Sequence, residues 1–369
     1  MIMCSSKVAV VGSGISGAVC ASILGRNGVS VTLFESARGP GGRMSQRREV
    51  CEDGEELFFD HGAPFFTASN NEVLGLVHEW ESRGLVAEWK GNFGSFDCIS
   101  RKFIHVEQEA TSKRYVGVPG MNSICRTLCQ EPGVESKFGT SVGKLEWLEG
   151  EDLWSVMGLD GQNLGCFNGV VASDKNIASP RFTSLTGRLP PLDLNLAPEL
   201  ADKVQDIPVH PCFALMLAFA GPVSSIPLNG FSIKNSKILS WAHCDSSKPN
   251  RDPTSERWVL HSTMEYAQNV ISQTGLQKPS DETLTRVSEE LFQELGSMGL
   301  NIPQPHFKKA HRWGSAFPAT SIAGEEKCLW DREKRLAICG DFCVGPNVEG
   351  AITSGATAAS KLNEILSCL

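Results

Sequence analysis

The 369-residue sequence predicts an α/β fold, in which a domain built on a parallel sheet is joined to a second lobe of mainly antiparallel sheet plus helix. Three observations predict it. Near the N-terminus, an apolar run of strand length leads through glycines into a helix-like stretch. A similar order of strand, turn and helix returns near the C-terminus. Between them lie short apolar runs separated by turn residues, which are typical of antiparallel strands.

The first of these segments is Val8–Gly17, whose apolar run enters the pattern G-x-G-x-x-G at Gly12, Gly14 and Gly17. This order of strand, glycines and helix is typical of a Rossmann-like dinucleotide site. The first glycine permits a tight turn, the second lets the backbone approach a pyrophosphate, and the third lets the helix pack closely on the strand. The phosphates then lie at the helix N-terminus, where Ser16 is a further candidate contact. An ordinary turn between a strand and a helix is the alternative.

A second apolar segment, residues 29–34, ends at Glu35, about 20 residues beyond the glycines. A carboxylate in this place accepts hydrogen bonds from a ribose 2′-hydroxyl, whereas it would repel a 2′-phosphate. The adenosine half of the ligand is therefore predicted to be of the FAD or NAD kind and not of the NADP kind.

A second glycine cluster follows directly and ends in Gly42, Arg43 and Met44. Its glycines let backbone approach a ligand, and Arg43 can give charge-assisted hydrogen bonds to phosphate. The succession G-x-G-x-x-G, Glu, Gly-Gly-Arg-Met resembles the FAD signature of the flavin amine oxidase superfamily. These three residues are therefore predicted FAD contacts, with a flexible loop as the alternative.

Near the C-terminus, residues 336–341 predict a short buried strand that ends in Gly-Asp. In the superfamily that the chain resembles, such an aspartate, here Asp341, lies near the ribityl and pyrophosphate groups. The helix that follows points its N-terminus at the flavin O2/N1 edge, and its roughly half unit of positive charge stabilises the reduced flavin. The residues predicted to tune the flavin in this way are Val348, Glu349, Gly350 and Ala351. A surface-capped helix is the alternative.

Further segments resemble the renalase family and its bacterial and plant relatives, which are flavoproteins of this superfamily. Residues 60–66 (Asp-His-Gly-Ala-Pro-Phe-Phe) resemble the family's D-x-G-A-aromatic segment, which implies that Gly62 and Ala63 bring backbone to the flavin. Residues 114–121 (Arg-Tyr-Val-Gly-Val-Pro-Gly-Met) resemble its R-Y-V-G-x-P-G-M segment. Weaker similarities follow in family order at 245–251, 258–261 and 311–313, so the resemblance spans nearly the whole chain.

This resemblance implies an FAD-dependent oxidoreductase that moves a hydride from a small-molecule donor to flavin N5, with oxygen as acceptor. Renalase relatives oxidise isomeric forms of reduced nicotinamide dinucleotides, and similar chemistry is expected here. Such a donor is electron-rich and needs no strong base, and the sequence shows no pairing of a nucleophile with a base. The pocket candidates are aromatic or imidazole side chains: Phe65, Phe66, Trp241, His243, His261 and Trp313. Core packing is the alternative for each.

Two segments depart from the family's pattern. Asp174 and Lys175 form a charged pair where many relatives have a Thr-Pro or Ala-Pro turn, and residues 179–208, with five prolines, are longer than in compact bacterial members. Both lie where connections to the substrate domain are expected. They bear on the identity of the substrate more than on FAD binding.

Two other functions stay open. A flavin amine oxidase or desaturase would act on an organic amine or an isoprenoid, although 8% aromatic residues and only two tyrosines give little sign of an aromatic cage for an amine. A flavin-binding scaffold or redox sensor without turnover is the alternative of a different class.

Because the FAD motifs lie at both ends of the chain, the FAD-binding domain is predicted to be discontinuous. It takes residues 1–75, 115–175 and 305–369, and the substrate domain takes 76–114 and 176–304. Strands 212–219, 237–244 and 257–263 and a helix over 281–298 are predicted for the substrate domain.

The net charge of −8 argues against nucleic acid or an anionic membrane as a partner. No run approaches the roughly 18 apolar residues that span a bilayer, and residues 1–7 lack the pattern of a cleaved signal. Thirteen cysteines, an odd number, favour reduced thiols and a cytoplasmic location. The pairs Cys125/Cys129 and Cys339/Cys343 are predicted to be core thiols, and no metal site is predicted. The sequence predicts neither the oligomeric state nor whether a targeting segment has been removed.

Overall fold

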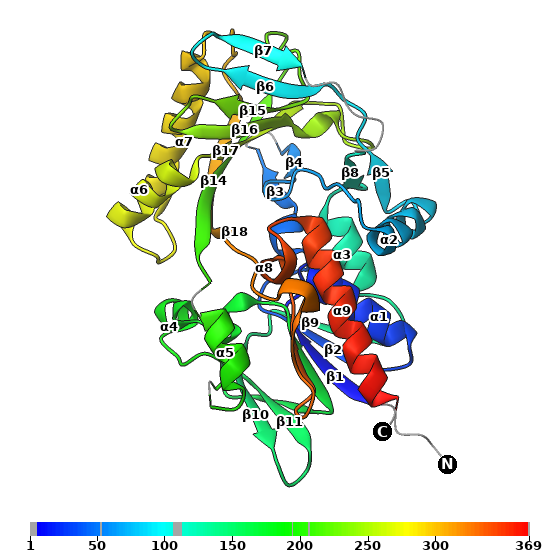
Figure 1. Ribbon diagram of the computed structural model, residues 1–369. Coiled ribbons are helices and arrows are strands. Elements are labelled where there is room, and N and C mark those ends of the chain that lie inside the picture. The colour runs from blue at the N-terminus through cyan, green and yellow to red at the C-terminus, as the bar shows by residue number, and fades with distance from the viewer. Residues whose placement is uncertain (1–5, 52–53, 106–112, 194, 206, 368–369) are drawn as a thin grey trace.

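The computed structural model describes residues 6–51, 54–105, 113–193, 195–205 and 207–367, so the expectation for residues 1–7 falls mostly outside it. Two large sheets organise the molecule, one in the lower and one in the upper part of the view (Figure 1). The lower sheet is mainly parallel and the upper one mainly antiparallel, which confirms the predicted fold class.

The lower sheet has six strands in the order β19-β20-β13-β1-β2-β9. They are β1 (Lys7–Val11), β2 (Ser30–Glu35), β9 (Val134–Phe138), β13 (Gly169–Ala172), β19 (Leu329–Asp331) and β20 (Leu336–Ile338). Every neighbouring pair is parallel except β19 with β20. Val8 and Val10 are fully buried, because a central parallel strand is covered on both faces.

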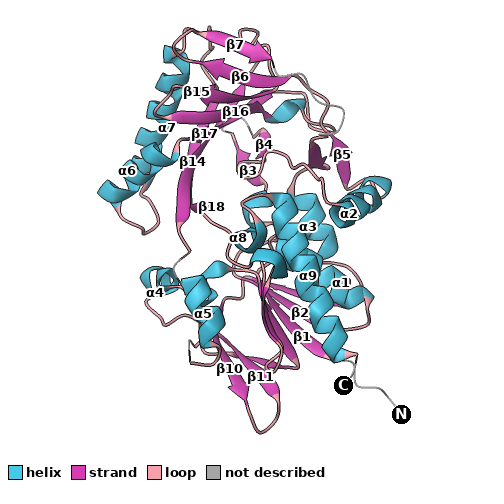
Figure 2. Ribbon diagram, viewed as in Figure 1, coloured by secondary structure: helices cyan, strands magenta, loops and turns pink. Residues whose placement is uncertain are grey.

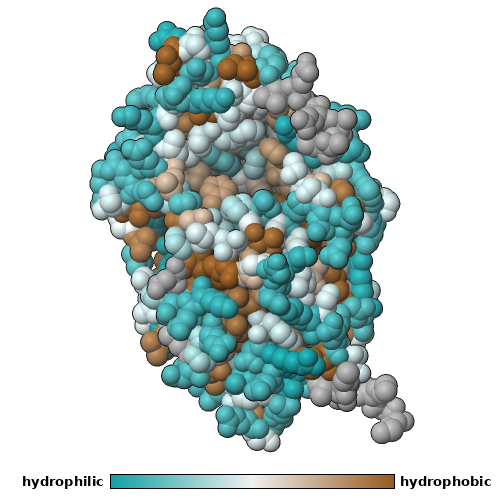
Figure 3. Space-filling view, viewed as in Figure 1, coloured by the Kyte–Doolittle hydropathy of each residue, from teal (hydrophilic) through white to brown (hydrophobic). Residues whose placement is uncertain are grey.

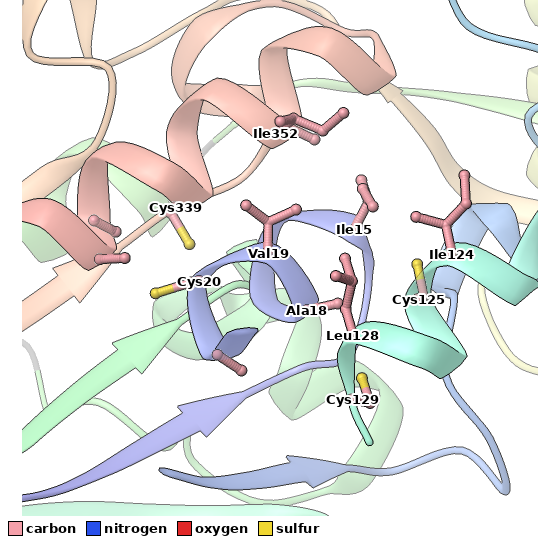
Figure 4. Close-up of a cluster of buried hydrophobic side chains, with 14 of the residues drawn as sticks. Ile15, Ala18, Val19, Cys20, Ile124, Cys125, Leu128, Cys129, Cys339 and Ile352 are labelled. Carbon is pink, nitrogen blue, oxygen red and sulfur yellow. The ribbon is translucent and has the colours of Figure 1, made fainter. Parts of the chain in front are cut away.

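One face of this sheet is covered by α1 (Ile15–Arg26), α3 (Asn122–Leu128) and α9 (Val348–Leu366). Figure 4 shows Val19 of α1 between α3 and α9, with the thiols of Cys20, Cys125 and Cys339 among the apolar side chains. At the crossing of α1 and α9, a Cβ added to Gly355 would lie 2.2 Å from the carbonyl oxygen of Ser16. Glycine at this position therefore lets the two helices touch through their backbones.

The other face is covered by a three-stranded antiparallel sheet and the segments that follow β13. The sheet consists of β10 (Val142–Leu148), β11 (Leu153–Gly158) and β12 (Asn163–Phe167), and the following segments are η2 (Lys175–Ala178), α4 (Pro180–Thr186) and α5 (Pro198–Gln205). Trp154, Ile177 and Val204 share one apolar cluster with Phe34 of β2. The long segment after β13 thus packs on the lower part of the molecule.

The upper sheet has the order β18-β14-β17-β16-β15-β6-β7 (Figure 2). Its strands are β6 (Phe93–Asp97), β7 (Lys102–His105), β14 (Val209–Phe219), β15 (Gly230–Lys234), β16 (Leu239–Cys244), β17 (Glu256–Ser262) and β18 (Phe307–Pro318). Only β6 and β15 pair in parallel. Leu215 and Leu260 pack with Leu291 of α7 (Asp281–Ser297), and Ala267 of α6 (Met264–Thr274) joins this cluster.

Short elements connect the two parts. They are η1 (Gly42–Met44), β3 (Arg47–Val50), β4 (Glu56–Phe59), α2 (Asn71–Ser82), β5 (Val86–Glu88), β8 (Tyr115–Gly117), η3 (Asp245–Ser247), η4 (Gly324–Glu326) and α8 (Asp341–Val344). β18 pairs with β14 although it lies within 305–369, the range predicted for the FAD-binding domain. The exact division into domains stays a prediction. Among the described residues, no helix has the length and apolar character needed to cross a bilayer.

Candidate cofactor and substrate site

The two predicted glycine segments lie side by side at the carboxyl ends of β1 and β2. Gly12 adopts φ +99° and donates from its backbone N–H to the carbonyl of Phe34 at 2.8 Å. Gly41 donates to the carbonyl of Ser13 at 3.0 Å, which fastens the second segment to the first. A Cβ at Gly17 would lie 2.1 Å from the Gly12 carbonyl oxygen, whereas a Cβ at Gly14 would meet nothing within 4 Å. Gly17 is thus needed for packing, and Gly14 faces open space.

Glu35 ends β2 with its carboxylate turned toward this loop. Its Oε2 accepts hydrogen bonds from the backbone N–H and the hydroxyl of Ser13, at 2.9 and 2.6 Å, and its Oε1 accepts one from the N–H of Ala37 at 2.8 Å. The carboxylate is therefore fixed beside the glycines, as the spacing of the sequence predicts for a group that binds ribose.

Arg43 and Asp341 are brought together from opposite ends of the chain. Arg43 also donates to the carbonyl of Ala316 in β18 at 2.9 Å. The Asp341 side chain is 4% exposed and the Arg43 side chain 38%. Burial opposes the charge on Arg43, but the hydrogen-bonded Asp341 carboxylate outweighs it and raises the pKa of the guanidinium.

The N-terminus of α9 lies close to this pair, because α8 and a short turn connect Asp341 to it. Asn347 caps the helix: its Oδ1 accepts from the N–H of Gly350 at 2.7 Å. Glu349 is turned away and accepts from the N–H groups of Ser69 and Asn70, at 2.5 and 2.6 Å, at the start of α2. Among the predicted helix residues, Glu349 therefore acts as a link to α2, while Val348, Gly350 and Ala351 form the first turn.

The segment after β4 lies against the second glycine cluster. The N–H of Ala63 donates to the carbonyl of Arg43 at 2.8 Å. A Cβ at Gly62 would lie 2.0 Å from that same carbonyl oxygen and 3.2 Å from the ring of Trp313. Met44 is 3% exposed beneath them. The structure thus gathers the predicted backbone contacts around one cradle.

The six pocket candidates fall into two groups. Phe65 and Trp241 have ring centroids 5.9 Å apart, and Trp241 donates from Nε1 to Nδ1 of His243 at 3.2 Å. In the other group, Nε2 of His261 lies 3.2 Å from the carbonyl oxygen of His61, and Nε1 of Trp313 donates to the same oxygen at 3.1 Å. The rings of His243 and His261 lie 6.2 Å apart and connect the groups. Phe66 is instead buried, with its ring centroid 5.6 Å from that of Tyr115.

Sequence reasoning missed several members of the first group. Trp89 and Phe93 each place their ring centroid 6.1 Å from that of Phe65. The guanidinium of Arg114 lies 3.9 Å from the Phe93 centroid and 5.6 Å from that of Phe65, and its Nη1 is buried without a hydrogen-bond partner in the described chain. Burial lowers the pKa of Arg114. The Arg-Tyr-Val-Gly motif contained this residue but did not indicate its partners.

Two histidines complete the second group. The ring of His61 lies 4.7 Å from that of His311 and 4.8 Å from that of Trp313. Burial lowers the pKa of His61 to about 3, of His261 to about 4 and of His311 to about 4. All three imidazoles are therefore neutral at physiological pH.

A buried ionic network lies behind these rings. Lys248 donates to Asp60 Oδ2 at 3.1 Å and to Asp245 Oδ1 at 2.6 Å, and Arg251 donates to Asp60 Oδ2 at 2.6 Å. The Lys248, Asp60 and Asp245 side chains are fully buried. Burial opposes the ionisation of Asp245, yet Lys248 and the hydrogen bonds around it lower the pKa of this carboxyl. The network fixes the Asp60–Phe66 segment to the upper sheet.

These residues fit a dinucleotide flavin. A helix N-terminus with an open Gly14 suits a pyrophosphate, the fixed Glu35 suits ribose hydroxyls, and Arg43 with Asp341 offers both a donor and an acceptor beside them.

A candidate cation site lies elsewhere in the described residues. Ligand atoms of Cys51, Glu55 and His306 fall within 4.8 Å of one another, at a place the sequence did not predict.

Two family models match the chain. One describes an NAD(P)-binding Rossmann-like domain and matches residues 10–80. The other describes a flavin containing amine oxidoreductase and matches residues 79–363, which is most of the chain.

Two curated relatives share a short segment with this chain. The mitochondrial protoporphyrinogen oxidase of Nicotiana tabacum is 38% identical over 73 residues, and the carotenoid phi-ring synthase of Streptomyces griseus is 39% identical over 70 residues. These alignments cover 20% and 19% of this chain, and only 14% of the length of either relative.

Solved structures resemble the whole chain in fold. A protein from Exiguobacterium sp. 255-15, assigned as a protoporphyrinogen oxidase, has a TM-score of 0.71 at 13% identity, over 98% of this chain and 100% of its own. An oxidoreductase from Methanosarcina mazei scores 0.63 at 12% identity, over 95% and 98% of the two chains. A putrescine oxidase double mutant scores 0.59 at 13% identity, over 97% and 99%. At such identities the likeness shows the fold alone.

Proposed function

The chain belongs to the flavin containing amine oxidoreductases, and we propose that within this family it is a renalase-like oxidase of isomeric reduced nicotinamide dinucleotides. It is an FAD-dependent oxidoreductase. FAD supplies, when bound, the acceptor for a hydride and the route of the electrons to oxygen. Overall, one reduced dinucleotide, one proton and one O2 give one oxidised dinucleotide and one H2O2.

Two sets of residues are proposed to hold the cofactor. The adenosine diphosphate half contacts Gly12, Gly14, Ser16, Gly17 and Glu35. The flavin half contacts Gly42, Arg43, Met44, Gly62, Ala63, Asp341, Val348, Gly350 and Ala351. Glu349 supports this half indirectly, because it holds the start of α2 beside the helix N-terminus. The N-terminus of α9 favours negative charge next to it.

The observation that carries the proposal is the clustering of His61, His261 and His311 with Trp313, where burial lowers the pKa of each imidazole. Removing a hydride from an electron-rich dihydronicotinamide requires orientation and exclusion of water, and no strong base. Burial holds His61, His261 and His311 neutral, and the rings of His61 and His311 pack against Trp313, so these groups orient and shield without bearing charge. Their lowered pKa values also make them weak bases.

The aromatic group around Phe65 argues against an amine substrate. An aromatic cage attracts an ammonium ion through the faces of its rings. Here the guanidinium of Arg114 already lies over Phe93 and near Phe65, and among the described residues no carboxylate pairs with it. A second cation would be repelled from this group of rings.

The test begins with the visible absorption spectrum of the purified protein. Under anaerobic conditions, isomeric reduced NAD should bleach the flavin band, while normal NADH, putrescine and benzylamine should not, and air should restore the band with release of H2O2. Bleaching by an amine would replace the proposal with an amine oxidase. A flavin band that no compound bleaches would favour a scaffold or redox sensor.

A further inference from the structure

A cleft of about 330 Å³ opens beside the cofactor cradle, between the segment that follows β13 and the start of β14. It lies where α4 and α5 approach the lower end of β14 (Figure 1). Figure 3 shows apolar side chains gathered on this part of the surface. None of the predicted cofactor contacts lines the cleft.

Two cations line one side of the cleft. Lys175 and Arg181 make no side-chain hydrogen bond or ion pair with any described residue. A Cβ added to Gly314 of β18 would lie 2.7 Å from Nη2 of Arg181, so this guanidinium rests on the edge of the upper sheet. Burial lowers the pKa of both groups, as expected for cations that have lost water without gaining a partner.

The charges around this pair leave the cleft positive. Asp174 is exposed and attracts both cations. The charges of Arg43 and Asp341, which also act on Lys175, cancel within their own ion pair. Arg312 adds a positive charge near Arg181 while it donates to the carbonyls of Gly275 and Leu276. Among the described residues, Asp174 is thus set against three cations, Lys175 and Arg181 in the cleft wall and Arg312 beside Arg181.

The rest of the cleft offers an acceptor and an apolar wall. Oδ1 of Asn176 is buried and has no hydrogen-bond partner among the described residues, so it can accept from a hydroxyl or amino group of a ligand. Val204, Ile207 and Val209 form the apolar side. Cations for phosphate, an acceptor for a hydroxyl or amine, and an apolar surface for a flat base are together the requirements of an adenosine phosphate.

We propose that this cleft binds the phosphate-bearing adenosine end of the dinucleotide donor, while its nicotinamide end reaches the cofactor cradle. The inference rests on the proposed function. It also gives a role to the charged Asp174-Lys175 pair and to the long segment after it, which depart from the pattern of the resembled family. Arg181 is then a residue that selects a phosphate-bearing donor.

The test uses ADP-ribose, which carries the adenosine and the pyrophosphate but no hydride to give. Its binding to the FAD-loaded protein is measured by calorimetry for the wild type, Arg181→Gln, Arg181→Lys and the matched control Arg188→Gln, which removes an exposed charge on the same segment. We expect Arg181→Gln to raise the Kd about tenfold or more, because a charge-assisted hydrogen bond is lost. Arg181→Lys should recover part of the affinity, Arg188→Gln should match the wild type, and adenosine alone should bind far more weakly than ADP-ribose.

Two outcomes would overturn the inference. The first is a Kd for ADP-ribose that is the same in Arg181→Gln as in the wild type, or no binding of ADP-ribose to the wild type at all. The second is loss of FAD from Arg181→Gln, which would assign the cleft to the cofactor. Bleaching by isomeric reduced NAD is read separately on the wild type. If isomeric reduced NAD bleaches the flavin but Arg181→Gln leaves ADP-ribose binding unchanged, only the proposed subsite is refuted. If isomeric reduced NAD does not bleach the flavin but ADP-ribose binding depends on Arg181, only the proposed donor is refuted.

Discussion

Arg43 and Asp341, 298 positions apart in the sequence, share two parallel hydrogen bonds: Nη1 to Oδ2 at 2.6 Å and Nη2 to Oδ1 at 2.7 Å. The same guanidinium reaches the carbonyl of Ala316 in β18. One side chain thus joins the second glycine cluster, the last Gly-Asp motif and the upper sheet. This geometry is bidentate, which an ammonium group cannot reproduce.

Replacing Arg43 with alanine leaves the buried Asp341 carboxylate without its partner. We expect unfolding free energy to fall by about 1–3 kcal/mol, less than for a fully buried pair because Arg43 is partly exposed. The ratio of FAD to protein after purification should fall as well. Arg48→Ala, which removes an exposed arginine from β3, is the control. Full FAD retention in Arg43→Ala would show that this residue does not contact the cofactor.

Gly14→Ala and Gly17→Ala should separate cofactor binding from folding. The added methyl meets nothing at Gly14 but lies 2.1 Å from the Gly12 carbonyl at Gly17. Gly14→Ala should therefore keep a near-native thermal midpoint in the apoprotein and lose FAD affinity. Gly17→Ala should yield unstable protein. Circular dichroism melts of the apo forms measure stability, and FAD titrations measure affinity. Equal thermal midpoints for the two variants would contradict the packing role of Gly17.

Glu35→Ala removes the proposed ribose acceptor, and Glu35→Gln keeps one oxygen but loses the charge. FAD content should decrease in the order wild type, Gln, Ala, because hydrogen bonds to a charged acceptor are the stronger ones. Ser30→Ala, at the exposed start of the same strand, serves as the control. Flavin fluorescence released on denaturation gives the content, and an unchanged value in Glu35→Ala would remove Glu35 from the site.

The geometry of the motifs proposed to bind phosphate and ribose could be predicted because each motif is local. Val8–Gly17 and Glu35 lie within one strand–helix–strand unit, where spacing alone determines geometry. The pairing of Arg43 with Asp341 could not be predicted, since each residue had an independent reason to contact the ligand. His61 and His311 lie in segments that resemble family motifs, but the motifs did not indicate that these two histidines are pocket candidates or that their rings meet. Their burial depends on β18 packing over the segment that follows β4.

Secondary structure was predicted best where apolar periodicity is strong. The helix predicted over 281–298 is α7 (Asp281–Ser297), and the strand predicted over 212–219 lies within β14 (Val209–Phe219). For the segment 179–208 the sequence predicts only a connection. It forms α4, which buries none of its residues, and α5, whose Leu200 and Val204 join the apolar cluster that contains Trp154 of β11. The layer β10–β12 is itself absent from the sequence-based prediction.

Stability should fall as pH drops from about 6.5 to about 4. In the unfolded chain, an imidazole takes up a proton near pH 6.5, whereas burial lowers the pKa of His261 to about 4 and of His61 to about 3. The unfolded state thus binds more protons in this window, so the stability present above it is lost on acidification. Near pH 5, His261→Gln should reduce the pH slope of the unfolding free energy by about 1.4 kcal/mol per pH unit. Urea denaturation at several pH values checks this, with the exposed His78→Gln as control; identical slopes would refute it.

Lys248→Met should destabilise the fold strongly. It leaves the buried carboxylates of Asp60 and Asp245 without their shared cation, at a cost of about 3–5 kcal/mol. The exposed Lys234→Met in β15 should change stability little. Differential scanning calorimetry compares the two. A small loss in Lys248→Met would mean that Arg251 alone neutralises Asp60.

Because α1 packs against α9, the site near the N-terminus cannot be completed until the C-terminal helix has been synthesised. A ribosome adds about 5–20 residues per second, so Arg43 is made roughly 15–60 s before Asp341. Through that interval the first glycine segment lacks the helix that packs on Ser16, and the second glycine cluster lacks the carboxylate that holds Arg43. FAD is therefore expected to bind after the final helix has been synthesised, as one of the last steps in the maturation of each molecule.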